Sequence, residues 1–352
     1  MKISKDAYGK THGGEAVDAY TLSGGKVTLR LMTYGGTWLS LTAPDREGQL
    51  SDIALGASDL EGYQNPNNPY LGALIGRCGN RIGNSKFELN GKQYAVTPNK
   101  HPHHLHGGTV GFDKKLWKAS VVKHGGKEKL MLSLISSDGE EGYPGCLEVK
   151  VYHYITDDGA IELEYNAIGD ADTLCNLTQH NYFNLDGHAG GHILNHELTV
   201  NADYVTDVDA ALIPNGKVIK VAGTAFDFNK SKAIGRDIAE NILAQAKGYD
   251  VNYVITRKGG GLQKVAEVYS PKSGRCMEVW TTKPSVQLYT GNYFNNLSGK
   301  DGAVYNQYAG FALETQYAPD SINHKNAFGY DADIVLKKGK TYKHITIYKL
   351  KT

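Results

Sequence analysis

The chain has 352 residues, and its 38 basic and 37 acidic side chains leave a formal net charge of +1. This balance argues against a general electrostatic attraction to nucleic acid or to an anionic membrane surface. Four Cys without a Cys-x-x-Cys pair argue against a disulfide scaffold and a clustered zinc site. No apolar run approaches the length of a membrane span, so we expect a soluble, cytoplasmic protein.

Short runs that alternate between apolar and polar residues recur along the chain, as is typical of strands with one buried face. They fall at residues 26–32, 86–89, 130–135, 147–154, 160–165, 198–200, 264–269, 277–280, 285–289 and 342–348. The turn pairs Asn90-Gly91, Asp158-Gly159 and Ser273-Gly274 lie between such runs and predict hairpins. We therefore predict an all-β fold, a sandwich or barrel, that forms one domain over residues 1–352.

Helix is scarce in this pattern. The clearest candidate is the segment 236–247, which reads Arg-Asp-Ile-Ala-Glu-Asn-Ile-Leu-Ala-Gln-Ala-Lys and is followed by Gly248 as a stop signal.

The first polar cluster is the segment 101–108, His-Pro-His-His-Leu-His-Gly-Gly. Four His could bind a metal, but alternate side chains of a loop point in different directions and no carboxylate stands at a fixed offset. The segment could also be an ordinary polar loop. The functional interpretation is that the two Gly after His106 let the backbone turn sharply and bring this side chain close to a ligand.

Two further segments combine polar side chains with apolar neighbours. His180 lies in Thr-Gln-His-Asn-Tyr-Phe-Asn-Leu over 178–185, which is more polar than an ordinary core strand. Glu314 follows Phe-Ala-Leu in the segment 310–317. If its side chain points inward, it is a buried carboxylate that needs a partner or a function. From the residues alone, a structural and a functional role are equally open for each.

Taken together, these segments resemble the aldose 1-epimerase (galactose mutarotase) family. The similarity covers almost the whole chain and rests on motifs in the family's order: Gly76-Arg77 with Asn80-Arg81-Ile82, residues 105–108 with Gly111-Phe112-Asp113, residues 178–185, Phe226-Asp227-Phe228 with Ile234-Gly235-Arg236, Gly248-Tyr249-Asp250, and Leu313-Glu314-Thr315-Gln316. The resemblance implies a twisted antiparallel β-supersandwich with a site in a cleft. It also implies a general base at Glu314, a general acid at His180, and sugar-binding residues at Arg77, His106 and Asp250.

The sequence departs from the family's pattern near two of these motifs. Val251-Asn252-Tyr253 follows Asp250, where a His and an aromatic or small residue are common, and Tyr317-Ala318-Pro319 follows Gln316, where His or Phe and then Pro are common. The acid and base are untouched by these changes. The changes near Asp250 and Gln316 bear on which aldose the protein prefers.

The implied reaction interconverts the α and β anomers of a free hexose such as glucose or galactose. It needs one base for the C1 hydroxyl and one acid for the ring oxygen. It requires no metal or other cofactor, and the sequence has no GxGxxG turn or P-loop. We expect a monosaccharide as partner and a monomer or homodimer. Tyr289 and Tyr293 could support the sugar ring, whereas Trp38 is better explained as a sheet residue.

Three alternatives stay open at this point. A hexose-phosphate epimerase of the same fold would want a cluster of Arg or Lys around the phosphate. A non-catalytic sugar-binding protein would be expected to lack Glu314 or His180. A glycoside hydrolase would need two carboxylates, for which Asp250 and Glu314 could serve.

An acid at His180 and a base at Glu314 predict a bell-shaped dependence of kcat/KM on pH. At this stage, we expect nearby carboxylates to raise the pKa of His180 and place the basic limb above about 6.5, with the acid limb set by Glu314.

Overall fold

The computed structural model describes the chain except residues 258, 326 and 329–332, and its largest elements are three antiparallel sheets. The nine-stranded sheet contains, in order, β11 (Lys118–His124), β12 (Lys127–Ser136), β13 (Leu147–Ile155), β14 (Ile161–Gly169), β29 (Thr341–Lys351), β23 (Cys276–Thr281), β22 (Gln263–Tyr269), β17 (Glu197–Val200) and β20 (Lys232–Ala233). One five-stranded sheet contains β1 (Lys2–Lys10), β2 (Ala16–Gly24), β3 (Val27–Met32), β4 (Trp38–Pro44) and β5 (Leu50–Asp52). The other contains β19 (Pro214–Lys220), β18 (Ala202–Val208), β21 (Asp250–Ile255), β24 (Ser285–Tyr289) and β27 (Ala312–Gln316).

Short strand pairs and single turns of helix connect these sheets. The pairs are β6 (Ala73–Ile75) with β16 (Thr178–His180), β7 (Arg81–Ile82) with β10 (His104–Leu105), β8 (Lys86–Leu89) with β9 (Lys92–Ala95), β15 (Thr173–Leu174) with β28 (Val335–Leu336), and β25 (Leu297–Ser298) with β26 (Val304–Tyr305). The helices are α1 (Leu60–Gln64) and the 3-10 turns Gly83–Ser85, Phe112–Lys114, Glu140–Gly142, Ile234–Asp237, Asn241–Ala246 and Lys300–Gly302. None of these described helices is long and apolar enough to cross a membrane.

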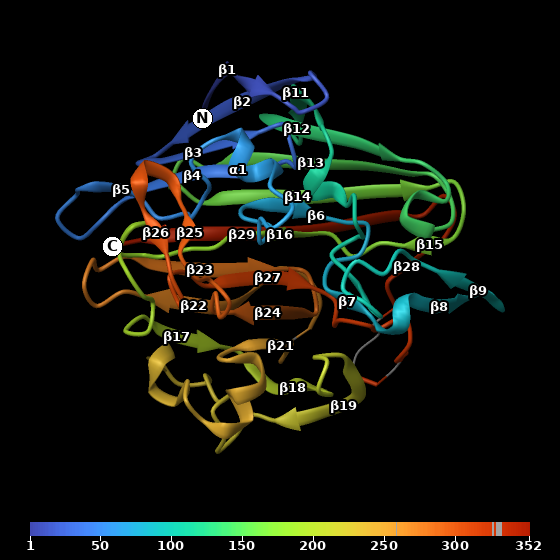
Figure 1. Cartoon of the computed structure of the whole chain (residues 1–352). Coiled ribbons are helices and arrows are strands. Elements are labelled where there is room, and N and C mark those ends of the chain that lie inside the picture. Colours follow the sequence, from blue (N-terminus) through green and yellow to red (C-terminus); the bar gives the residue numbers. More distant parts are fainter. Residues whose placement is uncertain (258, 326, 329–332) are drawn as a thin grey trace.

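The layers can be followed in Figure 1. The sheet β1–β5 lies at the top of the view, β18, β19 and β21 lie at the bottom, and the long strands β13, β14 and β29 cross the middle. Apolar side chains from all three sheets form one core cluster that extends in sequence from Tyr20 to Tyr348. This continuity supports the predicted single domain, which stays a prediction.

The predicted strands are confirmed, because every predicted run overlaps a strand of the structure. Burial alternates along several of them, whereas Ser285 to Leu288 of β24 are buried in succession. In β13, Leu147, Val149 and Val151 are buried while the residues between them face outward. Asn90 and Gly91 connect β8 to β9 with φ values of 52° and 76°. Positive φ at both central residues is the conformation that a two-residue hairpin turn needs, and this pair adopts it at low cost.

The helix predicted over 236–247 is wrong. The structure has two 3-10 turns there, separated by a break at Glu240, whose φ of −61° and ψ of 141° are extended. Asp237 in the first turn binds the ammonium of Lys232 at 2.6 Å. We infer that this tertiary contact, together with the extended Glu240, outweighs the local preference for a continuous helix.

Arg77 lies in the interior, not in a ligand site. Its side chain is only 1% exposed, and its guanidinium donates to the carbonyl groups of Ser136, Ser137 and Pro144 and to the hydroxyl groups of Ser136 and Thr173. All five of its N–H donors are therefore used by backbone carbonyl and hydroxyl groups of the surrounding protein. The expected placement of Arg77 among the sugar-binding residues is thus contradicted, because its side chain points into the protein.

Replacing Arg77 by Met should lower the free energy of unfolding by about 3 kcal/mol, because several buried carbonyl groups lose their donors. Guanidinium unfolding monitored by fluorescence measures the loss. Arg30→Met is the control, because Arg30 is 37% exposed and pairs with the exposed Asp6, and such a pair contributes at most about 1 kcal/mol. A loss below about 1 kcal/mol for Arg77→Met would contradict this interpretation.

Candidate active site

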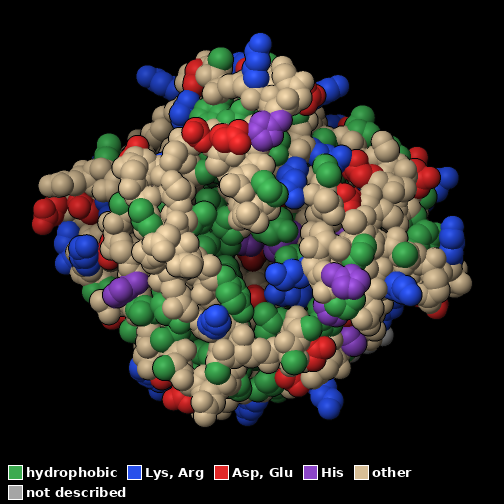
Figure 2. Space-filling view, in the orientation of Figure 1, with side chains coloured by type: hydrophobic (Ala, Val, Ile, Leu, Met, Phe, Trp, Pro, Cys, Tyr) green, Lys and Arg blue, Asp and Glu red, His purple; other side chains and the backbone are tan. Residues whose placement is uncertain are grey.

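A cavity of about 360 Å³ contains the polar side chains that the sequence singles out, apart from Arg77. A hollow opens near the centre of the face shown in Figure 2, over the region of β16 and β27, and acidic, His and basic side chains meet there. The lining includes Tyr70, Asn80, Arg81, Lys100, His103, His106, His180, Tyr182, Gln245, Asp250, Tyr289, Tyr293 and Glu314. A cavity with a few convergent polar groups is the expected form of a small-molecule site.

The register of one sheet places the two acidic residues on the same face, with β24 between their strands. Glu314 on β27 lies opposite Gln287 on β24, which lies opposite Asn252 on β21. Directly opposed residues share a face, and so do residues two apart on a strand. Asp250 is therefore on the same face as Glu314, and the amide of Gln287 joins the two positions by donating to Asp250 at 2.6 Å.

His180 reaches the same space from β16. Its Nε2 lies 3.5 Å from Oε1 of Glu314, and the two residues are only 4% and 2% exposed. The rings of Tyr70 and Tyr182 flank the imidazole, with centroid distances of 5.8 and 4.9 Å. A His and a carboxylate in direct reach of each other and of the cavity form an acid–base pair.

Burial sets the protonation of this pair. It raises the pKa of Glu314 to about 8, with a smaller contribution from the charge of Asp250. It lowers the pKa of His180 to about 4, although Asp250 acts in the opposite direction. Desolvation disfavours the charged form of either group. The expected increase in the pKa of His180 is therefore wrong, because the loss of hydration outweighs the attraction of the nearby carboxylate.

His106 is held in a single orientation. It has a φ of 50°, and the backbone N–H of Asn80 donates to its Nδ1 at 3.1 Å. The next residue must be Gly, because a Cβ on Gly107 would lie 1.8 Å from the carbonyl oxygen of Gly76. Burial lowers the pKa of His106 well below its usual range, so the imidazole is neutral. Since Nδ1 accepts, the proton is on Nε2, and this nitrogen can donate to a ligand.

Arg81, not Arg77, is the arginine of the cavity. Its guanidinium lies 3.4 Å from the carboxylate of Asp250, and both side chains are mostly buried. It is placed by the pairing of β7 with β10, in which Arg81 stands opposite Leu105, the residue before His106. Both arginines belong to the same short motif, and no sequence pattern distinguishes the one that faces the cavity.

The other aromatic and basic lining residues differ in how well the sequence predicts them. Tyr289 and Tyr293 line the cavity as suggested. Trp38 is fully buried beside Tyr348, with ring centroids 5.7 Å apart, so its interpretation as a sheet residue is confirmed. Tyr70, Lys100 and Gln287, which binds Asp250, lie in no motif, whereas Tyr182 and His103 lie inside segments 178–185 and 101–108 but are not distinguished there from their neighbours. They are recognised only once the strands are in place.

The histidines of the 101–106 loop do not converge. His104 is buried against the hydroxyl of Tyr143 and the carbonyl of Thr97, whereas His103 accepts from the backbone of Asn84. Only His106 joins a group with metal-ligand character, in which its ring, His180 and Glu314 offer atoms within 4.8 Å of one another. This group fits a cation poorly, because the N–H of Asn80 occupies the lone pair on Nδ1 of His106. The proton of the imidazole is then on Nε2, and a nitrogen that carries a proton has no free lone pair with which to bind a metal ion.

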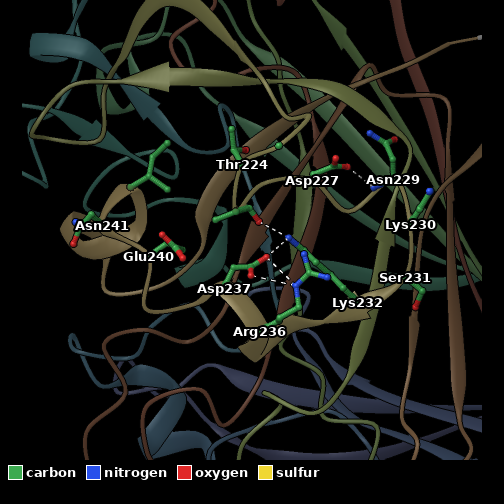
Figure 3. A pocket seen from close by; sticks show the side chains of 13 residues that line it. Thr224, Asp227, Asn229, Lys230, Ser231, Lys232, Arg236, Asp237, Glu240 and Asn241 are labelled. Carbon is green, nitrogen blue, oxygen red and sulfur yellow. Dashed lines mark hydrogen bonds and ion pairs between the residues drawn. The ribbon is translucent and has the colours of Figure 1, made fainter.

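A larger groove of about 660 Å³ lies away from this cavity and is shown in Figure 3. Three of its charged groups pair with one another: Lys232 and Arg236 both bind Asp237, and Lys232 also donates to the carbonyl of Ala225. Its lining residues include no His and no aromatic side chain. The smaller cavity, which holds the acid–base pair, is therefore the candidate active site.

Comparisons with known proteins find relatives that cover nearly the whole chain. The family model described as aldose 1-epimerase matches residues 18–349. The galactose mutarotase of Homo sapiens is 42% identical over 340 residues, which are 96% of this chain and 95% of the relative. The aldose 1-epimerase of Escherichia coli K12 is 35% identical over 324 residues, 92% of each chain.

Two solved structures match the whole fold. An aldose epimerase homologue from C. elegans has a TM-score of 0.84 and 28% identity, with 99% of each chain covered. Galactose 1-epimerase from Lactobacillus acidophilus has a TM-score of 0.84 and 25% identity, with 99% of this chain and 98% of the other covered. The expected antiparallel β-supersandwich is confirmed. The chain belongs to the aldose 1-epimerase family.

Proposed function

We propose that the protein is an aldose 1-epimerase that interconverts the α and β anomers of a free hexose by opening and reclosing the ring. The observation that carries this proposal is the pair formed by His180 and Glu314, whose Nε2 and Oε1 atoms are 3.5 Å apart in a buried cavity. Membership of the family and the 42% identity to a galactose mutarotase support it.

In the proposed mechanism, the carboxylate of Glu314 accepts the proton of the C1 hydroxyl while the imidazolium of His180 donates to the ring oxygen. The C1–O bond of the ring breaks, C1 rotates about the C1–C2 bond, and the ring closes on either face. The two protons then return along the same routes, so the enzyme needs no redox partner. Each positioned acid or base contributes about 10²–10⁴-fold to the rate.

The remaining polar residues of the cavity hold the sugar in this mechanism. His106 donates from Nε2 to a hydroxyl group, and Asp250 accepts from one. Arg81 takes the binding role that was expected for Arg77. Tyr289 and Tyr293 lie beside these groups and offer apolar ring surface. Arg and carboxylate side chains suit hydroxyl groups, which both donate and accept hydrogen bonds.

A free hexose is favoured over a phosphorylated one. The guanidinium of Arg81 is already paired with Asp250 at 3.4 Å and with the side chain of Asn80 at 3.3 Å. A phosphate would have to compete with the carboxylate for this group. Lys100 and His103 also line the cavity, so glucose 6-phosphate should be compared with glucose as a substrate.

The direct test is polarimetry of freshly dissolved α-glucose and α-galactose with and without the protein, together with the Glu314→Gln variant. We expect the wild-type protein to accelerate anomerisation and Glu314→Gln to lower kcat at least 100-fold, because the variant keeps the shape but cannot accept a proton. Circular dichroism checks that the variant is folded. Near-normal activity of the folded variant would remove Glu314 from the mechanism, and an inactive wild-type protein would refute the proposed function.

The two cavity histidines should respond differently to the same substitution. His180→Asn should lower kcat by two orders of magnitude or more with little change in sugar affinity, because its proton is needed in the transition state. His106→Asn should raise KM as well, because it removes a hydrogen bond to the bound sugar. The comparison is made from full kinetic curves. If His106→Asn abolished turnover and His180→Asn did not, the two roles would have to be exchanged.

The pH profile follows from the reversed order of the two pKa values. The active enzyme has one proton shared by the pair. A second proton binds below the pKa of about 4 of His180, and the shared proton is lost above the pKa of about 8 of Glu314. We expect kcat/KM to be bell-shaped with limbs near these values, which belong to the coupled pair. A basic limb near 6.5 would show that burial does not control His180. Spontaneous anomerisation is subtracted at each pH.

A further inference from the structure

The strands that bear the acid and the base belong to different ladders. β16 pairs with β6, whereas β27 pairs with β24. The seam between β16 and β27 is closed at both ends. The backbones of Phe183 and Phe311 exchange hydrogen bonds of 2.8 and 2.9 Å, and the side-chain amide of Asn176 pairs with the backbone of Tyr317 at 3.0 and 3.3 Å.

Between these closures, two backbone carbonyl groups depend on a side chain for their hydrogen bonds across the seam. The carbonyl groups of Leu177 and Thr315 both accept from the ammonium of Lys283, with a distance of 3.3 Å to Thr315. A carbonyl oxygen cannot donate, so two of them can be joined only through a shared donor. The Nζ of Lys283 is that donor.

The surroundings of Lys283 are consistent with this bridge. The residue is 0% exposed, and its Nζ lies 3.9 Å from the ring centroid of Tyr165, on the core side of the seam. No carboxylate among the described residues lies within ion-pair distance of it. A buried charge is costly unless it is paired or hydrogen-bonded. Burial lowers the pKa of Lys283 to about 7. The two carbonyl groups and the aromatic ring are the partners of Nζ inside the protein, and the N–H groups of either protonation state can donate to both carbonyls.

We propose that Lys283 is a positioning residue for the acid–base pair, because it fixes the separation of the two strands that bear His180 and Glu314. The inference rests on the proposed function. Thr315 directly follows Glu314, and Leu177 is three residues before His180, so a shift at the bridge changes the 3.5 Å separation of the pair. A misplacement of about 1 Å can cost about 100-fold in rate.

The test replaces Lys283 by Met, which has a similar length and no donor. We expect kcat for α-glucose to fall at least tenfold. Affinity for 1,5-anhydroglucitol, which lacks the anomeric hydroxyl and cannot open its ring, should stay within twofold when measured by calorimetry. A merely structural role would not produce this split between turnover and binding.

Lys232→Met is the matched control. Lys232 is also a buried lysine that donates to a backbone carbonyl, that of Ala225 at 2.8 Å, and its ammonium lies 4.3 Å from the ring centroid of Phe228. It lies in the separate groove of Figure 3. We expect this variant to lose thermal stability and to keep kcat within twofold.

A folded Lys283→Met protein with kcat within twofold of wild type would overturn the inference, as would an equal loss of kcat in both Met variants. If Lys283→Met does not fold, Lys283→Gln is used, since it keeps two N–H donors on a shorter side chain. Hydrogen exchange should then accelerate in residues 176–183 and 311–317, with a lower kcat. Uniform acceleration or unchanged kcat would overturn the bridge. An inactive wild-type protein would instead refute the proposed function.

Discussion

The 3.5 Å contact between His180 and Glu314 is the interaction on which the rest of this structure depends. The two residues lie across a seam that the backbones of Phe183 and Phe311 close at one end and that side chains of Asn176 and Lys283 bridge elsewhere. If β16 and β27 formed a regular ladder, backbone hydrogen bonds would hold them too close together for a ligand to fit between them. Opening the seam lets two side chains face each other and leaves room for a ligand, but the strands must then be held apart at a fixed distance by other means.

The surrounding sheets provide that rigidity. On β27, Leu313 faces the large apolar core while Glu314 faces the cavity, and Ala312 and Gln316 are also buried. The side-chain period of two on a strand therefore couples the site to the core: any slip of β27 by one residue would bury Glu314 in the apolar layer. A buried carboxylate and a buried imidazole lower stability, and the extensive core offsets this cost.

The sequence predicted the fold and most of the site because both depend on local patterns. Alternation marked the strands, and unusual polarity marked His180 and Glu314. Prediction from the sequence failed where the role of a residue depends on the direction in which its side chain points. Arg77 and Arg81 are four residues apart in one motif, yet Arg77 enters the interior and Arg81 faces the cavity. Lys283 has no motif, because its role exists only after Leu177 and Thr315 come together.

The same limit explains the error in the protonation of His180. A sequence shows which charges are present but not how much water remains around them. Asp250 favours the imidazolium, and in an exposed site that attraction would dominate. In this cavity the burial of His180 has the larger effect and lowers its pKa to about 4. Desolvation acts on the isolated group, whereas attraction requires both charges to be present.

Because the pKa of Glu314 is higher than that of His180, the proposed mechanism requires a proton to move from Glu314 to His180 when the sugar binds. In the empty cavity, the raised pKa of Glu314 and the lowered pKa of His180 favour the proton on Glu314 and a neutral His180, so that neither group carries a buried charge. In the proposed mechanism, a bound hexose donates its C1 hydroxyl to the carboxylate and accepts at its ring oxygen from the imidazolium. Hydrogen bonds to a charged form favour that form. In the proposed mechanism, a sugar with both oxygens in place therefore favours transfer of the proton from Glu314 to His180, which gives the reactive pair.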